Sequence, residues 1–220
     1  MYRVLEILTP QEVIQCREIA AAAPFLDGRV SNPHNKAKQN EQLHDQAAYQ
    51  RSSELLKQAL ARSPEFAEFA FPVALAPPMM TRYKPGMKYG AHADAAFIQL
   101  PGATIRSDLS CTIFLNDPAD YDGGELHVRL GDADLKFKLQ PGEAIVYPSD
   151  SLHQVVPVTR GERLVAITFI QSRIQDPFHR NLLFELNEVA ALEGLKMSEE
   201  NFGRLQLVQQ NLLRYWSDMP

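Results

Sequence analysis

Apolar residues recur every three or four positions in the first third of the chain, which is the spacing of one helix face. The first such segment covers residues 9–23, where Thr9 can cap the helix and Glu12 can complete a capping box. Residues 47–62 repeat the pattern, and Pro64 either ends that segment or opens a short further helix. The chain therefore begins with predicted helices.

A polar stretch at residues 27–46 separates the two helical segments and contains Gly28, Pro33 and several asparagines. It predicts a long surface loop, because turn-forming residues dominate it. A long loop can close over a site and exclude water. Residues 27–46 are therefore a candidate lid.

From Met79 the apolar spacing changes to alternate positions, which is typical of strands. The predicted strands cover residues 108–115, 126–130, 135–139, 144–147, 155–158 and 164–170. Turns are predicted at residues 131–134 and at Pro141–Gly142. Short strands at this spacing, without helical crossovers, indicate an antiparallel sandwich or barrel.

Helical spacing returns after Asp176–Pro177. One predicted helix carries apolar residues from Leu182 to Ala190. A second opens at Ser198 and carries apolar residues from Phe202 to Trp216. Helices therefore flank the predicted strands on both sides.

The layout predicts an α+β fold with a mainly β core at about residues 79–171. We expect one domain over residues 1–176, followed by a C-terminal helical extension over residues 177–220. A chain of 220 residues is long enough for a single large core.

Composition narrows the class of protein. The net charge of −5 argues against a general nucleic-acid binder, because phosphate binding needs a basic surface. No apolar run approaches the roughly 20 residues of a membrane span, and the N-terminus does not resemble a signal peptide. The two cysteines, Cys16 and Cys111, fall in a helical and a strand pattern, so we expect buried free thiols and a cytoplasmic location.

A candidate metal site combines His92 and Asp94 with His153, far downstream. Two residues that are two apart on a strand point to the same face. Two histidines and one carboxylate can occupy one face of an Fe(II) octahedron and leave the other positions open. Taken separately, the His-x-Asp pair can be a chance feature of a polar edge strand, and His153 a lone histidine at a strand start. Their joint presence in a strand series favours the metal.

Arg163 follows His153 by ten positions, where a returning strand can bring it near the metal. A guanidinium grips a carboxylate through two parallel hydrogen bonds. Arg160 is a competitor for this role, since strand periodicity does not decide which side chain faces the interior. Metal and carboxylate anchor together indicate a 2-oxoacid bound to iron.

The other histidines are weaker candidates. His127 alternates with apolar neighbours and is expected to face solvent if they face the core. His34, His44 and His179 lie outside the strand series and are interpreted as surface residues.

Several short motifs, in one order along the chain, carry a resemblance to a known family. They are Asp27-Gly28-Arg29-Val30, Arg82-Tyr83, Tyr89-Gly90-Ala91-His92-Ala93-Asp94, Arg106-Ser107-Asp108-Leu109-Ser110, Tyr121-Asp122-Gly123-Gly124-Glu125-Leu126, Tyr147-Pro148-Ser149-Asp150-Ser151-Leu152-His153, Pro157-Val158-Thr159-Arg160-Gly161-Glu162-Arg163 and Leu183-Phe184-Glu185-Leu186. The sequence resembles the PKHD-type hydroxylases, a bacterial prolyl/lysyl-hydroxylase-like branch of the Fe(II)- and 2-oxoglutarate-dependent dioxygenases that is often labelled an iron-uptake factor.

This resemblance implies a double-stranded β-helix, or jelly roll, with flanking helices. It implies that His92, Asp94 and His153 bind Fe(II) and that Arg163 binds the distal carboxylate of 2-oxoglutarate. Tyr83 is similar to a tyrosine that helps to hold 2-oxoglutarate in the family. The resemblance further implies dioxygen as a reactant, succinate and carbon dioxide as products, and L-ascorbate as an accessory cofactor.

Two alternatives concern what the site acts on. The substrate can be a protein side chain or a small molecule, and net acidity only mildly disfavours acidic substrates.

A non-catalytic metal or 2-oxoglutarate sensor, acting through its C-terminal helices, is the competing class. The apolar stripe from Leu205 to Trp216 can serve such a partner, pack on the domain or pair two copies of the chain as a homo-oligomer.

Overall fold

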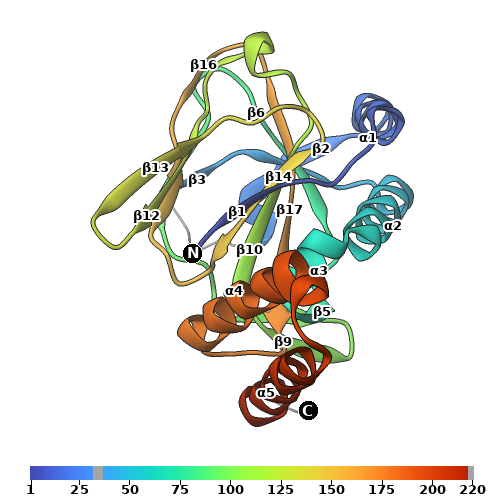
Figure 1. Ribbon diagram of the computed structural model, residues 1–220. Coiled ribbons are helices and arrows are strands. Elements are labelled where there is room, and N and C mark those ends of the chain that lie inside the picture. Colours follow the sequence, from blue (N-terminus) through green and yellow to red (C-terminus); the bar gives the residue numbers. More distant parts are fainter. Residues whose placement is uncertain (32–36, 218–220) are drawn as a thin grey trace.

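The computed structural model describes residues 1–31 and 37–217. Two antiparallel sheets form its β core, and helices flank this core (Figure 1). The larger sheet contains, in spatial order, β1 (Arg3–Glu6), β14 (Glu143–Pro148), β10 (Leu109–Phe114), β17 (Arg163–Ser172), β6 (Met79–Tyr83), β4 (Glu41–Leu43) and β2 (Phe25–Asp27), with β5 (Pro72–Leu75) also paired to β17.

The smaller sheet contains, in order, β13 (Ala133–Phe137), β12 (Leu126–Leu130), β15 (His153–Val155), β7 (Lys88–His92) and β3 (Lys38–Gln39). Two further pairs join β8 (Phe97–Leu100) to β9 (Ala103–Arg106), and β11 (Asp122–Gly123) to β16 (Val158–Arg160). The predicted mixture of helices with a mainly antiparallel β core is confirmed.

The helices are α1 (Pro10–Ala22), α2 (Gln46–Arg62), α3 (Pro64–Ala70), α4 (Pro177–Glu193) and α5 (Glu199–Trp216), with short 3₁₀ turns η1 (Gly28–Ser31), η2 (Pro118–Asp120) and η3 (Gly194–Lys196). Both halves of the predicted capping box at Thr9 and Glu12 are present. Pro64 opens a helix of its own, with Ser63 as N-cap. In the part of the chain that the structure describes, no helix is long and apolar enough to cross a membrane.

Strand β10 shows how the sequence separates two cores. Leu109, Cys111 and Ile113 belong to the apolar cluster that α1, α2, α3 and α4 also supply. Phe114 belongs to a second cluster, formed with residues of β12 and β15 of the facing sheet. Alternate positions of one strand thus pack against helices and against the other sheet. Polar residues on the inner face are therefore enclosed between the sheets, where they can form a site.

The two cysteines are free and buried, as predicted. Burial raises the pKa of both the Cys16 and the Cys111 thiols to about 12. Thiols with such pKa values stay protonated and unreactive at neutral pH.

The prediction of one long loop over residues 27–46 is wrong for much of that stretch. It contains η1 and the strands β3 and β4, and α2 begins at Gln46. Backbone pairing of β3 with β7, and of β4 with β2 and β6, orders these polar residues. Such pairing uses partners distant in sequence, so local composition did not reveal it. Residues 32–36 of the predicted loop lie outside the described residues.

Two predicted boundaries in the β region also change. The turn predicted at residues 131–134 is shorter, because β13 begins at Ala133. Residues 155–158, predicted as one strand, are divided between β15 and β16, which belong to different sheets. Pro157 lies at this break and has no N–H to donate to a sheet.

Several short strands have no counterpart in the sequence interpretation. Strand β1 precedes the first helix and extends the larger sheet beside β14. The hairpin of β8 and β9 lies between Asp94 and His153 in the sequence, and β5 pairs with β17. Each has four residues or fewer, too short for apolar alternation to stand out.

Candidate metal centre

His92 and His153 face each other across a strand pair. His92 ends β7 and His153 begins β15, and the two residues are direct partners in the ladder. Asp94 follows β7 by two positions, and the loop that carries it is tied down where its backbone N–H donates to the Ser149 carbonyl. Two strands and one loop therefore bring together residues that are far apart in the sequence.

The ligand atoms converge. Nε2 of His92 lies 3.9 Å from Oδ1 of Asp94, and Nε2 of His153 lies 3.5 Å from Oδ2. One atom from each of the three residues lies within 4.8 Å of the others. Within residues 1–31 and 37–217, this is the one group of three or more such side chains with the spacing of a metal site.

Backbone carbonyls orient both imidazoles. Nδ1 of His92 lies 2.8 Å from the Gly90 carbonyl oxygen, and Nδ1 of His153 lies 2.9 Å from that of Ser151. A carbonyl oxygen only accepts, so each Nδ1 carries the hydrogen and each Nε2 lone pair is free to ligate. Burial, and then the neighbouring His153, lower the pKa of His92 below its usual 6.5, which favours the neutral ligand form.

A cavity of ≈ 50 Å³ extends from these three residues between the two sheets, and Arg163 also lines it. Arg163 begins β17 and has a relative exposure of only 1%. Its guanidinium carbon lies 5.1 Å from the centre of the Tyr83 ring and 5.5 Å from that of Phe114. In the described part of the chain, its Nε has no hydrogen-bond partner. A buried cation with an unsatisfied donor is suited to an anionic ligand.

The structure separates Arg163 from its competitor. Arg160 is exposed and makes hydrogen bonds of 2.7 and 3.1 Å to the carboxylate of Asp122. It therefore lies outside the barrel and is already paired, so Arg163 is the interior arginine.

Tyr83 lies beside Arg163, because the two residues are partners in the pairing of β6 with β17. Its hydroxyl accepts a hydrogen bond of 3.0 Å from Nδ2 of Asn40, and both side chains line the cavity. Burial raises the pKa of the Tyr83 hydroxyl, which stays protonated and keeps a hydrogen to donate. All five predicted site residues thus surround one cavity.

Other cavity residues were missed by the sequence interpretation. Lys38 and Asn40 come from the stretch interpreted as a surface loop, yet both are buried and line the cavity. Burial lowers the pKa of Lys38 to about 8. Ser110 also lines the cavity, and its hydroxyl donates a 2.6 Å hydrogen bond to Oδ2 of Asp94. Alternation of β10 was the signal available for Ser110, and no local signal marked the other two.

The remaining histidines take no part in this centre. His127 is partly exposed while its neighbours Leu126 and Val128 are buried, as predicted. His44 is exposed, and His34 lies outside the described residues. His179 is not a free surface residue, because its ring stacks on that of Trp216 with centroids 4.2 Å apart. This contact between α4 and α5 was not visible in either helix alone.

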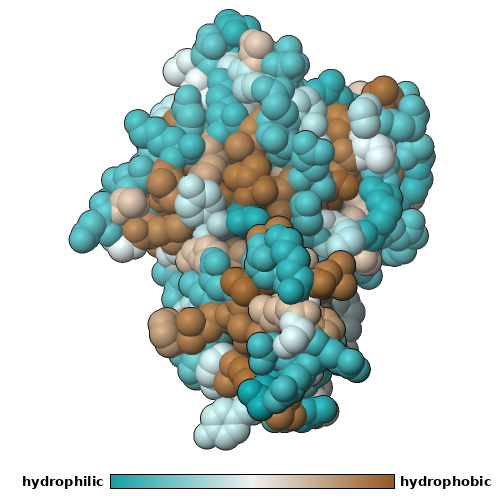
Figure 2. Space-filling view, in the orientation of Figure 1, coloured by the Kyte–Doolittle hydropathy of each residue, from teal (hydrophilic) through white to brown (hydrophobic). Residues whose placement is uncertain are grey.

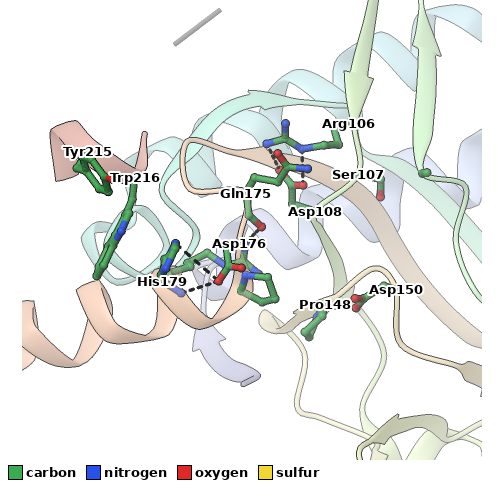
Figure 3. Close-up of a pocket in the computed structure, with 13 residues that line it drawn as sticks. Arg106, Ser107, Asp108, Pro148, Asp150, Gln175, Asp176, His179, Tyr215 and Trp216 are labelled. Atoms are coloured by element: carbon green, nitrogen blue, oxygen red, sulfur yellow. Dashed lines mark hydrogen bonds and ion pairs between the residues drawn. The ribbon is translucent and has the colours of Figure 1, made fainter. Parts of the chain in front are cut away.

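A larger cavity of ≈ 770 Å³ lies between the β core and the two C-terminal helices. Figure 3 shows the stacked rings of His179 and Trp216 on one side of it and Ser107, Pro148 and Asp150 on the other. None of the three candidate metal ligands lines this cavity.

Comparison with known proteins places the chain in a family. Residues 78–171 match the model of the 2OG-Fe(II) oxygenase superfamily, in which 2OG denotes 2-oxoglutarate. A PKHD-type hydroxylase from Sphingopyxis alaskensis is 60% identical over 216 residues, covering 98% of this chain and 99% of the relative. A PKHD-type hydroxylase from Caulobacter vibrioides is 40% identical over 226 residues, covering 100% of both chains.

Solved structures share the fold at low sequence identity. A prolyl-4-hydroxylase from Pseudomonas putida has a TM-score of 0.54 at 19% identity, covering 78% of this chain and 92% of its own. A prolyl hydroxylase from Trichoplax adhaerens has a TM-score of 0.57 at 15% identity, covering 82% and 86%. The predicted jelly roll is confirmed. With its full-length relatives and its oxygenase core, this chain belongs to the PKHD-type hydroxylases, which are Fe(II)- and 2-oxoglutarate-dependent enzymes.

Proposed function

We propose that His92, Asp94 and His153 hold the Fe(II) of this hydroxylase, and that Arg163 and Tyr83 hold its 2-oxoglutarate. The observation that supports this most directly is the convergence of two Nε2 atoms and a carboxylate beside a cavity that also contains a buried arginine. The donor set suits Fe(II), because two imidazoles and one carboxylate leave coordination positions for a cosubstrate and dioxygen. When bound, the iron supplies the activation of dioxygen that no side chain can provide.

The protein supplies position and shielding. The carbonyls of Gly90 and Ser151 keep the imidazoles of His92 and His153 in the tautomer that ligates through Nε2. His153 is buried and His92 is half-buried, which limits the access of bulk water to their ligating nitrogens. A substrate would be hydroxylated at the C–H bond that the protein holds beside the metal.

Arg163 fits the distal carboxylate of 2-oxoglutarate because its charge is buried and its Nε lacks a partner among the described residues. A carboxylate would supply both the charge and the acceptor. Asn40 fills one acceptor position on the Tyr83 hydroxyl, which leaves its hydrogen available for the same carboxylate.

L-ascorbate is proposed as an accessory reductant on the family resemblance alone. Its role would be to return iron that has become oxidised to the ferrous state. The proposal predicts that ascorbate extends the number of turnovers without being consumed in each one.

The test is an anaerobic titration with Fe(II) and 2-oxoglutarate, followed by a pulse of oxygen and an assay for succinate. Wild-type protein is expected to release succinate, and the His92→Ala variant is expected to bind neither metal nor cosubstrate. Tight 2-oxoglutarate binding without succinate, across a panel of protein and small-molecule substrates, would favour the sensor. Metal binding undiminished in His92→Ala would overturn the site assignment.

A further inference from the structure

Three buried serines form a hydrogen-bonded chain that ends on the proposed ligand Asp94. The hydroxyl oxygens of Ser107 and Ser149 are 2.8 Å apart, and those of Ser149 and Ser110 are also 2.8 Å apart. The Ser110 hydroxyl lies 2.6 Å from Oδ2 of Asp94. The three serines have relative exposures of 9%, 2% and 3%, for Ser107, Ser149 and Ser110 respectively. None of them belongs to the metal-ligand set.

The direction of every hydrogen bond in this chain follows from the acceptor at its end. A ligating carboxylate only accepts, so Ser110 must donate its single hydroxyl hydrogen to Asp94. Ser149 must then donate to Ser110, and Ser107 must donate to Ser149. Three aligned hydroxyl dipoles point toward the carboxylate, and hydrogen bonds in such a series polarise one another.

The backbone supports the same arrangement. The N–H of Asp94 donates to the carbonyl of Ser149, and the N–H of Ser107 donates to the carbonyl of Ala96. The loop that carries Asp94 is thus fastened on both sides to residues that belong to the serine chain. Two hydrogen bonds therefore hold Asp94: its backbone N–H donates to the Ser149 carbonyl, and its Oδ2 accepts from the Ser110 hydroxyl.

We propose that Ser110, Ser149 and Ser107 are positioning residues that fix the rotation of the Asp94 carboxylate. With Oδ2 engaged by Ser110, the carboxylate is kept in one rotation, in which Oδ1 lies 3.9 Å from Nε2 of His92 and Oδ2 lies 3.5 Å from Nε2 of His153. A ligand held in this way is already oriented when the metal binds. This inference rests on the proposed function, because it assumes that Asp94 ligates the metal.

The hydrogen-bonded series of three serines also connects the candidate metal centre with the larger cavity. Ser107, at its far end, is one of the residues labelled in the wall of the ≈ 770 Å³ cavity in Figure 3. Replacing Ser107 is therefore expected to alter the orientation of the Asp94 carboxylate, through the hydroxyls of Ser149 and Ser110 that lie between them.

The experiment measures metal affinity directly, without turnover. Co(II) serves as an oxygen-stable probe, titrated into the full-length protein with its visible spectrum as the readout. Ser110→Ala is expected to weaken Co(II) binding by about 10- to 100-fold, the usual effect of losing a partner of a metal ligand. Ser149→Ala is expected to weaken it less, and Ser107→Ala least. A changed visible spectrum of bound Co(II) in Ser110→Ala is expected, since the carboxylate is then free to rotate.

Ser52→Ala is the matched control. Ser52 is fully buried and donates to a backbone carbonyl, that of Tyr49 in α2, so its removal costs a buried hydrogen bond without touching Asp94. Its Co(II) affinity is expected to equal that of wild type. If Ser110→Ala does not fold, Ser149→Ala still tests the proposal, because it breaks the same chain one step further from the metal.

A double-mutant cycle separates a connected chain from independent packing effects. Once Ser110 is replaced, Ser149 no longer reaches Asp94, so adding Ser149→Ala is expected to cost no further Co(II) affinity. Additive losses, or a Ser110→Ala affinity within twofold of wild type, would overturn the positioning role. Failure of wild type itself to bind Co(II) would instead overturn the proposed metal site.

Discussion

At the residue scale, Arg163 determines how ligand binding and stability are linked. Its charge is buried and its Nε lacks a partner among the described residues, so the ligand-free protein bears a desolvation cost. We expect Arg163→Met to weaken 2-oxoglutarate binding by about 100-fold, the worth of a charge-assisted pair. The same substitution is expected to leave the Tm of the ligand-free protein unchanged or higher. Thermal unfolding with and without 2-oxoglutarate checks both effects.

Arg160→Met is the control, because that arginine is exposed and paired with Asp122. It is expected to leave 2-oxoglutarate affinity unchanged. A large fall in the Tm of ligand-free Arg163→Met would contradict this expectation, because it would show that the guanidinium stabilises the barrel without a ligand.

At the element scale, the turn before β12 lies close to Arg163. Gly124 has a φ of +69°, and a Cβ there would lie 2.9 Å from Cγ2 of Val158 and 3.1 Å from Cδ of Arg163. Gly131 has a φ of +60°, but a Cβ there would meet nothing within 4 Å. We expect Gly124→Ala and Gly131→Ala to lose similar stability through backbone strain, on the order of 1 kcal/mol, plus the cost of the clash at Gly124. Only Gly124→Ala is expected to weaken 2-oxoglutarate binding, as measured by calorimetry. Equal affinities in the two variants would contradict this coupling.

The start of α1 gives a prediction about pH. The hydrogen bond with Arg62 is the largest cause that lowers the pKa of Glu12 from 4.5 to about 2. Burial opposes this effect, and hydrogen bonds with the Thr9 backbone and side chain add to the lowering. A carboxylate with a lowered pKa stabilises the fold above its unfolded-state pKa, and this contribution is lost as pH falls through the folded-state value. Glu12→Gln is therefore expected to lower the Tm at pH 7. The difference from wild type should narrow as the pH falls from about 4.5 toward about 2, in melts recorded across that range. A difference that stays constant with pH would rule out the charge as its source.

At the scale of the whole molecule, the C-terminal helices contribute unequally to the core. Helix α4 buries Arg180, Leu183 and Phe184, and the Phe184 ring packs edge-on against Phe69. Helix α5 has no buried residue within its described span. In Figure 2, apolar side chains reach the surface around these helices, where Leu192 and Leu207 are 69% and 61% exposed. We expect the amides of α5 to exchange with deuterium much faster than those of β10, because few tertiary contacts protect them. Similar protection of both elements in hydrogen-exchange mass spectrometry would show that the apolar face is covered in solution.

The same contrast bears on the domain division proposed at residues 176 and 177. Helix α4 begins at Pro177 as expected, yet Phe184 belongs to the core that the larger sheet shares with the N-terminal helices. The division remains a proposal. It describes α5 better than α4, because only α4 buries side chains in that core.

The sequence by itself predicted the helices with strong caps, the longer strands of the core and the candidate site residues. These predictions depend on local chemistry: the Thr9 cap, the period of β10, and the His-x-Asp spacing of His92 and Asp94. The tertiary structure alone decided that Arg163 rather than Arg160 is interior, that Lys38 and Asn40 line the cavity, and that three serines reach Asp94. Each of these depends on pairing between strands distant in the sequence, such as β3 with β7 and β6 with β17. Local patterns do not encode such pairings, because which face of a strand is enclosed depends on the sheet that packs against it.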